Sequence, residues 1–177
     1  KEMTPRIQDL IEDMFETMYE ACGVGLAAPQ VGVLKQIVVI DVEDGNQDVL
    51  INPVITETSG SQTGSEGCLS VPGKSGVVTR PDHVKVKAFD CEMNEFELVG
   101  EGLLARAICH ECDHLSGDLF VDKVEGELTD VDQEEDETQP HGDELFPLSI
   151  HVFETDLQST VRVYCHWHEE VELFYAV

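Results

Sequence analysis

The stretch "ICHECDHLSG", residues 108–117, holds two histidines and two cysteines within ten positions. It overlaps the second half of a longer run, "EGLLARAICHECDHL" at 101–115, which has no internal proline. Gly117 follows two residues after this run, and glycine commonly terminates helices. These features predict a helix. With about 3.6 residues per turn, His110 and His114 lie about 40° apart on one face of it, close enough to bind one ligand together.

Glu111 completes the pattern H-E-x-x-H with these two histidines. On a helix, this pattern is typical of hydrolases in which the histidines bind a metal and the glutamate acts as the general base. The pattern also occurs by chance on solvated helix faces. Taken alone, it therefore leaves both interpretations open.

Cys109 and Cys112 form a C-x-x-C pair in the same stretch, a pattern also found in redox proteins and zinc sites. A redox pair normally opens a helix, where the free amides lower the thiol pKa. This pair instead lies inside the predicted helix, on the side away from the histidines. We therefore expect both cysteines to pack in a core, near Ile108 and Leu115.

A catalytic metal site needs a third protein ligand and an open position for water. The chain contains many suitable side chains, and their spacing does not choose among them. The candidates are Cys22, Cys68, Cys91, His83 and the numerous carboxylates.

Two other segments narrow the choice, namely "GVGLAAPQVG" at 23–32 and "EGCLS" at 66–70. Together with "HECDHLSG" at 110–117, they resemble the three signature motifs of the peptide deformylase family, in the same order. The resemblance extends from about Thr4 to Glu127. Three motifs in order are much more specific than H-E-x-x-H alone.

The resemblance implies that Cys68 is the third metal ligand, beside His110 and His114. Members of this family remove the formyl group from the N-terminal formyl-methionine of nascent polypeptides. Their usual metal is ferrous iron, and zinc, nickel or cobalt can occupy the same site. A thiolate combined with two imidazoles suits iron or zinc.

By the same resemblance, Glu111 takes the proton from the metal-bound water that attacks the formyl carbon, and passes it to the leaving amine. The side-chain amide of Gln30 and the backbone N–H of Leu69 would stabilise the oxyanion. Residues implied for the methionine pocket and the peptide backbone are Val24, Gly25, Gly67, Leu103 and Ala107. Leu103 and Ala107 lie one helical turn apart and lead to the face of His110, although plain core packing would give the same spacing.

The sequence also suggests residues that would orient the metal ligands. Asp113 precedes His114 and is a candidate to orient a ligand imidazole. The family pattern suggests a buried pair of Arg80 and Glu66 near it, whereas a surface charge at a strand end is the alternative for Arg80. Cys109 stands where some family members carry glutamine, and this departure leaves the proposed ligands untouched.

The remaining patterns predict an α+β fold. The segment "TPRIQDLIEDMFETMYEAC" predicts an amphipathic helix with Thr4 as its cap, Pro5 in its first turn and Gly23 as its end. Its apolar face comprises Ile7, Leu10, Ile11, Met14, Phe15 and Met18. Strands are expected at 36–42, 49–58, 76–80, 83–91 and 95–101, several of them alternating as half-buried antiparallel strands do. We expect these strands to enclose the central metal-binding helix.

Three regions are expected along the chain. Residues 1–126 form the deformylase-like domain, which begins almost at its first helix, so the strand that usually precedes it in the family is expected to be missing. Residues 127–145 form an acidic linker, with nine acidic residues between Glu127 and Glu144 and no Lys or Arg.

The last region, 146–177, has strand-like alternation, and its "HWHEEVELFY" resembles the first metal motif of cupin domains in sensory proteins. His166, His168 and Glu172 fit H-x-H-x3-E, but the region is too short to close a barrel. We interpret it as the start of a truncated second domain. A hairpin added to the deformylase sheet and a chance match are the alternatives.

The net charge of −27, with only 10 Lys and Arg residues, argues against nucleic-acid binding by this chain. No apolar run is long enough to cross a membrane, and six cysteines without a disulfide pattern indicate the reducing cytoplasm. The sequence does not determine the oligomeric state.

Two other functions compete with a deformylase. A general metallopeptidase would usually take its third ligand downstream of the helix, which disfavours it. An inert binding or sensory protein, with the cupin-like tail carrying its role, is opposed by the intact set of Gln30, Cys68, His110, Glu111 and His114.

Overall fold

The computed structural model describes residues 3–131, 160–163 and 171–174. In chain order its elements are α1 (Pro5–Glu20), β1 (Gly25–Ala27), the 3-10 helix η1 (Ala28–Val31), β2 (Ile37–Ile40), β3 (Asp48–Ser59), β4 (Gln62–Cys68), β5 (Val71–Arg80), β6 (His83–Phe89), β7 (Glu95–Glu101), α2 (Gly102–Ser116), the 3-10 helix η2 (Phe120–Lys123), β8 (Thr129–Asp130), β9 (Thr160–Val163) and β10 (Val171–Phe174). The predicted α+β class is confirmed.

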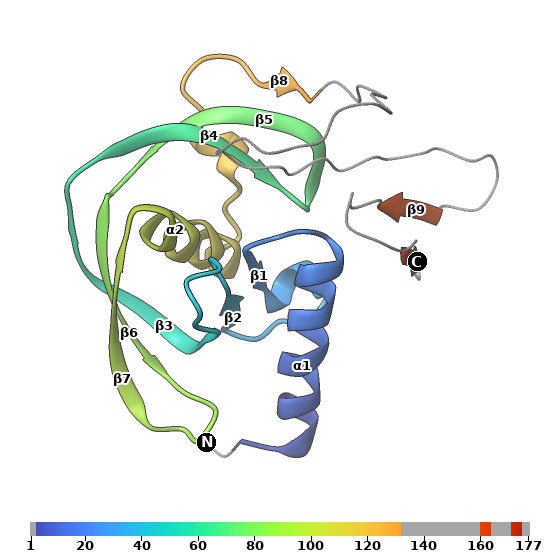
Figure 1. Ribbon diagram of the computed structural model, residues 1–177, viewed down its shortest axis with the longest axis vertical. Helices are drawn as coiled ribbons and strands as arrows, with labels where there is room; N and C mark the ends of the chain where they lie inside the picture. The colour runs from blue at the N-terminus through green and yellow to red at the C-terminus, as the bar shows by residue number, and fades with distance from the viewer. Residues whose placement is uncertain (1–2, 132–159, 164–170, 175–177) are drawn as a thin grey trace.

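The short strand β2 lies between the two α-helices and is buried on both faces. Val38 and Ile40 belong to a core cluster with α2, whereas Ile37 and Val39 belong to a cluster with α1. Because alternate residues of a strand point to opposite faces, both faces must be apolar, which explains the continuous "IVVI" run. Figure 1 shows α1 on one side of β1 and β2, with α2 on the other.

The main sheet is antiparallel, has the order β1-β2-β3-β6-β7, and curves around α2. Its inner face contributes Leu50, Val84, Val86 and Ala88 to the core around the helix. Ala105 and Ile108 are the fully buried helix residues that this face covers. The sheet therefore holds the predicted metal-binding helix in the middle of the molecule, as expected.

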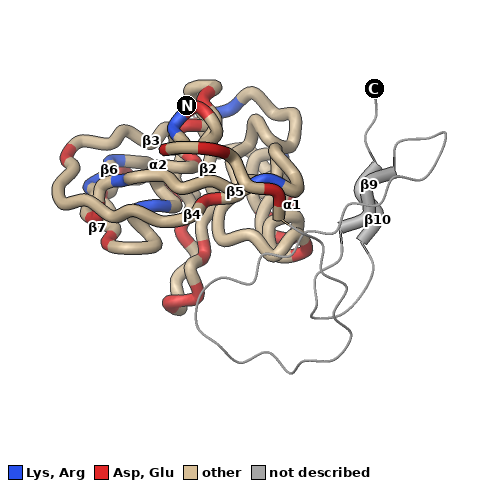
Figure 2. Tube along the Cα trace, turned by 90° about the horizontal axis from the view of Figure 1, so that it is seen from above, with Lys and Arg blue, Asp and Glu red and all other residues tan. Residues whose placement is uncertain are grey.

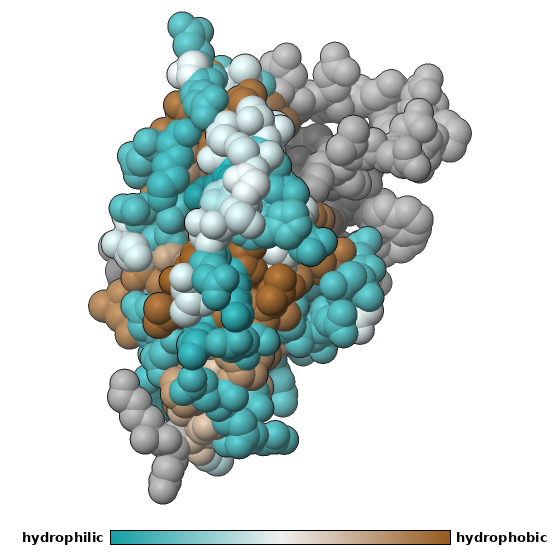
Figure 3. Space-filling view, turned by 90° about the vertical axis from the view of Figure 1, so that its left-hand side faces the viewer, coloured by the Kyte–Doolittle hydropathy of each residue, from teal (hydrophilic) through white to brown (hydrophobic). Residues whose placement is uncertain are grey.

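The outer face of this sheet carries alternating charges. Lys85 and Lys87 on β6 lie within ion-pair distance of Glu57, Glu95 and Glu97 on the neighbouring strands. Figure 2 shows these basic positions on β6 among acidic neighbours. Figure 3 looks onto this side of the molecule, where hydrophilic side chains cover most of the surface and hydrophobic ones gather near its middle.

A second sheet, in the order β4-β5-β8, forms one wall of the site described below. The strands β4 and β5 are a hairpin, with Gly67 opposite Ser75 and Cys68 opposite Val71. Strand β8 pairs with β5 through Asp130 and Thr129, two residues that the sequence placed in the acidic linker.

The helices match their predicted positions more closely than their predicted caps. Thr4 is the N-cap residue of α1 and Pro5 opens the helix, but the Thr4 side chain makes no capping hydrogen bond. The left-handed residue that follows α1 is Cys22, at φ 53°, one position before the predicted Gly23. Gly117 does end α2, with φ 85°.

The five predicted strands correspond to β2, β3, β5, β6 and β7, and the sequence missed β1, β4 and β8. Strand β4, "QTGSEGC", contains two glycines and no aliphatic residue, so it lacks the apolar alternation on which the strand prediction rested. It forms because β5 pairs with it and α2 covers it.

In the C-terminal region, β9 and β10 pair as antiparallel strands. His166 and His168 of the cupin-like motif lie outside the described residues, and Glu172 falls in β10. Within the part of the chain that the structure describes, no helix is both long and apolar enough to cross a membrane.

Candidate metal centre and active site

Helix α2 presents His110 and His114 toward the β4–β5 hairpin, and Glu111 toward Gly25 of β1. His110 and His114 lie in edge-to-face contact, with ring centroids 5.0 Å apart, and both are largely buried. Cys109 packs in the core on the other side of the helix, with Ile108 beside it. Burial raises the pKa of the Cys112 thiol to about 12, so it stays protonated at neutral pH. This supports the interpretation of the two cysteines as packing residues.

Cys68, at the end of β4, meets both histidines. Its Sγ lies 3.2 Å from His114 Nε2, and one ligand atom from each of Cys68, His110 and His114 falls within 4.8 Å of the others. Burial by itself raises the pKa of the Cys68 thiol, but hydrogen bonds and charges from His110 and His114 outweigh burial and lower it to about 6. A thiolate is the form of cysteine that binds metals.

Glu66 holds His110 from the other side. Its Oε2 lies 3.1 Å from His110 Nδ1, which leaves Nε2 of this ring as the nitrogen available to a ligand. Arg80 donates two hydrogen bonds of 2.9 Å to the same carboxylate, one to each oxygen. Burial raises the pKa of Glu66, but the hydrogen bonds from His110 and Arg80 outweigh it and lower the pKa to about 2. Glu66 is therefore an ionised acceptor that fixes the orientation of the imidazole.

The suggested pair of Arg80 and Glu66 is present and buried, each side chain being 5% exposed. The alternative of a surface charge for Arg80 is wrong. Asp113 makes no bond to an imidazole, contrary to its suggested role. Its Oδ2 accepts a hydrogen bond of 2.6 Å from Arg80, and Lys123 lies 2.6 Å from its other oxygen. Asp113 is linked to the proposed metal ligands only through Arg80. The Nδ1 of His110 already pairs with Glu66 and is therefore not available to Asp113.

Arg106 is a member of this network that the sequence reasoning missed. Its guanidinium donates to Glu66 Oε1 at 2.7 Å, to the carbonyl of Val78 at 3.2 Å and to that of Gln62 at 3.3 Å. Gly64 leaves room for it, since a Cβ there would lie 3.3 Å from Arg106 Nη2. The sequence does contain a signal that could have identified Arg106. It lies one helical turn before His110 and therefore on the same helix face.

Glu111 is the one buried side chain, within the described residues, that carries an unpartnered polar atom, Oε2. Burial raises its pKa to about 7, so the carboxyl group can take up and release a proton near neutrality. The side chain lies against the backbone of Gly25, where a Cβ would approach Glu111 Oε1 to 2.6 Å. Position 25 therefore has to be glycine for Glu111 to occupy this place.

Gln30 lies in η1 with its amide held at both ends. Its Oε1 accepts a hydrogen bond of 2.9 Å from the Ala27 backbone N–H. Its Nε2 donates to Ser70 Oγ at 3.1 Å and lies 3.7 Å from Cys68 Sγ. Because the side-chain carbonyl of Gln30 is bound to the backbone, its NH2 group faces the sulfur of Cys68 and the cavity.

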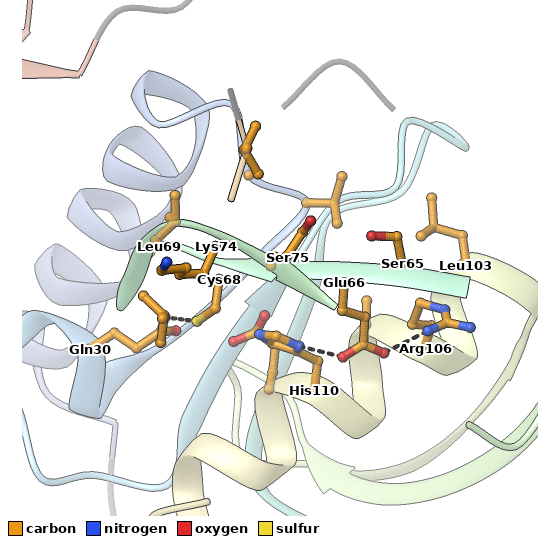
Figure 4. Close-up of a pocket in the computed structure, with 18 of the residues that line it drawn as sticks. Gln30, Ser65, Glu66, Cys68, Leu69, Lys74, Ser75, Leu103, Arg106 and His110 are labelled. Carbon is orange, nitrogen blue, oxygen red and sulfur yellow. Dashed lines mark hydrogen bonds and ion pairs between the residues drawn. The ribbon is translucent and has the colours of Figure 1, made fainter. Parts of the chain in front are cut away.

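A cavity of about 330 Å³ opens beside these groups. Figure 4 shows Cys68, Glu66 and His110 on one side of the hairpin, with Gln30 and Leu69 at one end and Leu103 and Arg106 at the other. The sequence-derived residues that line it are Val24, Gly25, Gln30, Gly67, Cys68, Leu69, Leu103, Ala107, His110 and Glu111. His114 does not line the cavity, but its Nε2 lies 3.2 Å from Cys68 Sγ. The fold thus brings all eleven candidate residues to one place.

The donor set fits a resident divalent metal ion. A low-pKa thiol and two imidazoles converge from β4 and α2, and Glu66 orients one of the rings. Glu111 Oε2 lacks a partner beside this cluster. Such buried polar atoms normally have one, so a metal-associated water is a suitable partner for it.

The fold and the site define a metal-dependent hydrolase with H-E-x-x-H on a central helix and an upstream cysteine ligand. Residues 1–129 match the family model of polypeptide deformylase. The chain belongs to the peptide deformylase family, which confirms the resemblance found in the three motifs.

Individual relatives agree with this assignment. The chain is 63% identical to the peptide deformylase of Lachnoclostridium phytofermentans over an alignment of 142 residues that covers 77% of this chain and 87% of that protein. It is 65% identical to the enzyme of Agathobacter rectalis over 134 residues, 76% and 84% of the two chains.

Solved structures show the same likeness. A peptide deformylase from Legionella pneumophila superposes with a TM-score of 0.68 at 48% identity, covering 71% of this chain and 75% of that one. One from Synechococcus elongatus, in complex with actinonin, gives a TM-score of 0.67 at 49% identity, covering 70% and 68%.

Proposed function

We propose that this chain removes the formyl group from N-formyl-methionyl peptides of nascent polypeptides, using Cys68, His110 and His114 as metal ligands and Glu111 as the general base. One observation carries the proposal. The buried Glu111 carboxyl, with an unpartnered oxygen, opens onto the same cavity as the Cys–His–His cluster. That combination supports hydrolysis rather than mere metal binding.

Ferrous iron is the metal we propose, because it is the usual metal of the family to which the chain belongs, and a thiolate and two imidazoles suit it. When bound, a divalent cation supplies Lewis acidity, which acidifies a water molecule and polarises the formyl oxygen. Glu66 holds His110 in the tautomer that presents Nε2.

Glu111 is proposed to take the proton from the attacking water, and its pKa near 7 suits that task. The same carboxyl group then returns a proton to the departing amine nitrogen of methionine. Glu111 is only 5% exposed, so its carboxyl group exchanges the proton with groups in the cavity rather than with bulk water.

Gln30 and Leu69 are proposed to stabilise the oxyanion that forms on the formyl carbon. Gln30 Nε2 faces the cavity because Oε1 is bound to the Ala27 N–H. The backbone N–H of Leu69 follows Cys68 directly and would be the second donor. Donors placed in advance avoid reorganisation during the reaction, and losing one typically costs roughly 10²- to 10³-fold in rate.

Substrate binding is proposed to use α2 and the edge of β4. Leu103 and Ala107, on the face of α2 that leads to His110, would contact the methionine side chain together with Val24. Strand β4 is an edge strand, and Gly25 and Gly67 let a peptide backbone approach closely.

The division of the chain also belongs to the proposal. The catalytic unit corresponds to residues 1–126 with β8 added to it, residues 127–145 otherwise act as the acidic linker, and residues 146–177 carry the cupin-like tail.

The decisive experiment measures formate release from formyl-Met-Ala by the full chain, purified without oxygen and loaded with Fe²⁺ or Ni²⁺. We expect release that stops with a chelator and returns with added metal. Cys68→Ser should weaken metal binding, measured by competition with a chromogenic chelator, whereas Cys91→Ser should not. A folded, metal-loaded protein that releases no formate would contradict the proposal.

A further inference from the structure

The segment that follows η2 returns along β5 and forms an added wall of the cavity. Strand β8 pairs with β5, and the Val131 N–H donates to the Gly73 carbonyl at 3.0 Å. Ser75 and Thr129 hydroxyls lie 2.9 Å apart, and Lys74 forms an ion pair with Asp130. Val131, fixed by these contacts, lines the same cavity as Gly67 and Leu69.

A glycine in β5 permits this arrangement. At Gly76, a Cβ would lie 2.5 Å from Val124 Cγ2 and 3.3 Å from Leu128 Cδ2. The Glu125 N–H also donates to the Val77 carbonyl at 2.8 Å. The segment from Val124 to Val131 therefore lies directly on β5, and its position is determined by packing as well as by hydrogen bonds.

The two faces of the sheet β4-β5-β8 differ in character. Glu66 and Cys68 point toward α2 and are buried, whereas Ser65 and Gly67 lie on the opposite, exposed face. Because side chains alternate along a strand, the row Gly67–Ser75–Thr129 shares that exposed face. Val131 lies two residues after Thr129, beside Gly73, so it belongs to the same face. Figure 4 shows Ser65 and Ser75 on the side of the hairpin opposite Glu66.

A peptide bound along the β4 edge would use both faces. If its methionine side chain enters the α2 side of the cavity, as in the proposed function, its second side chain points to the opposite face. There it meets a surface with Leu69 and Val131 as apolar groups. Lys74 and Asp130 compensate each other's charge at the border of this surface.

We propose that Val131 is a specificity-determining residue that favours substrates with a large apolar residue after formyl-methionine. The inference rests on the proposed function and names the substrate class within it. Val131 is 39% exposed, so a second side chain can cover it without displacing the wall.

The test compares formyl-Met-Leu with formyl-Met-Ala in the metal-loaded full chain. We expect kcat/KM to favour the leucine peptide by roughly 10-fold, the low end of what added methylenes achieve in a pocket. Val131→Asp should abolish that preference by raising KM for the leucine peptide, with kcat unchanged. Val131→Ala should reduce it partly. Val99→Asp, at a 58% exposed valine on β7, is the matched control and should keep the full preference.

Binding of the products Met-Leu and Met-Ala, followed by calorimetry, gives a readout that does not depend on turnover. We expect Met-Leu to bind more tightly to the unaltered protein and equally tightly to Val131→Asp. Equal binding of the two products to the unaltered protein, or a loss in Val131→Asp that is the same for both, would overturn the inference. Selective product binding without any formate release would contradict the proposed function instead.

Discussion

Glu111 shows what a single residue contributes to this site. It lies in a helix whose other polar groups near the cavity are paired, yet its Oε2 has no partner within the described residues. A buried carboxyl group without a partner is costly, and its raised pKa expresses that cost. The position makes sense where a proton must be taken up and released.

Glu111→Gln should keep the metal and lose turnover, because the amide preserves shape but cannot accept the proton. We expect formate release to fall by roughly 10²- to 10⁴-fold, with metal content unchanged by atomic absorption. Glu101→Gln, at an exposed position next to α2, serves as the control. Near-normal turnover of Glu111→Gln would remove the general-base role.

Arg106 affects the proposed metal ligands indirectly, because it holds Glu66, which in turn orients His110. Arg106→Met keeps an unbranched side chain but removes the 2.7 Å hydrogen bond to Glu66 Oε1. We expect metal affinity to fall about 10-fold or more, as is usual when a group that orients a ligand is lost. Arg106→Lys should recover part of the affinity. A metal Kd that is unchanged in Arg106→Met would show that Arg80 suffices to hold Glu66.

At the scale of elements, α2 depends on how it ends. Gly117 has φ 85°, and the N–H groups of Gly117 and Asp118 bond back to carbonyls of the last helical turn. Only glycine adopts this left-handed conformation without strain, which is why the sequence located this end correctly.

Gly117→Ala should lower the free energy of unfolding by about 1–2 kcal/mol, because its Cβ is strained in the left-handed region. Gly117→Asn should cost less, since asparagine tolerates that conformation. Urea denaturation of the metal-loaded protein measures both. If alanine and asparagine destabilise the protein equally, the strain argument is wrong.

At the scale of the whole molecule, two apolar clusters meet at β2, one under α1 and one under α2. The helix that carries the ligands and the helix that does not are thus held by the two faces of one strand. Packing of α1 should therefore affect stability far more than chemistry.

Met18→Ala tests this separation. Met18 is fully buried, and its truncation should cost about 2–5 kcal/mol in thermal or urea unfolding. Leu34→Ala is the control, because Leu34 is 93% exposed and should change stability by less than about 0.5 kcal/mol. Formate release at low temperature should stay normal in both. A loss of activity in folded, metal-loaded Met18→Ala would show that α1 also shapes the site.

Local patterns were sufficient for several features of this protein. The helical period placed His110 and Glu111 on the face that meets the cavity, with His114 beside Cys68, and it placed Cys109 in the core. Turn chemistry located Gly117, and the three motifs identified the family. These features depend on residues close together in the chain, where spacing alone defines geometry.

Other features were decided only by the tertiary structure. The acceptor for His110 is Glu66, 44 residues earlier, rather than Asp113, which lies three residues later in the same helix. Arg106, the strand β4 and the wall that ends at Val131 also depend on partners distant in sequence. Local spacing determines which side chains share a helix face, because the period of the helix is constant. Which charged groups meet across strands depends on register and packing, because these are properties of the folded molecule and not of any short segment.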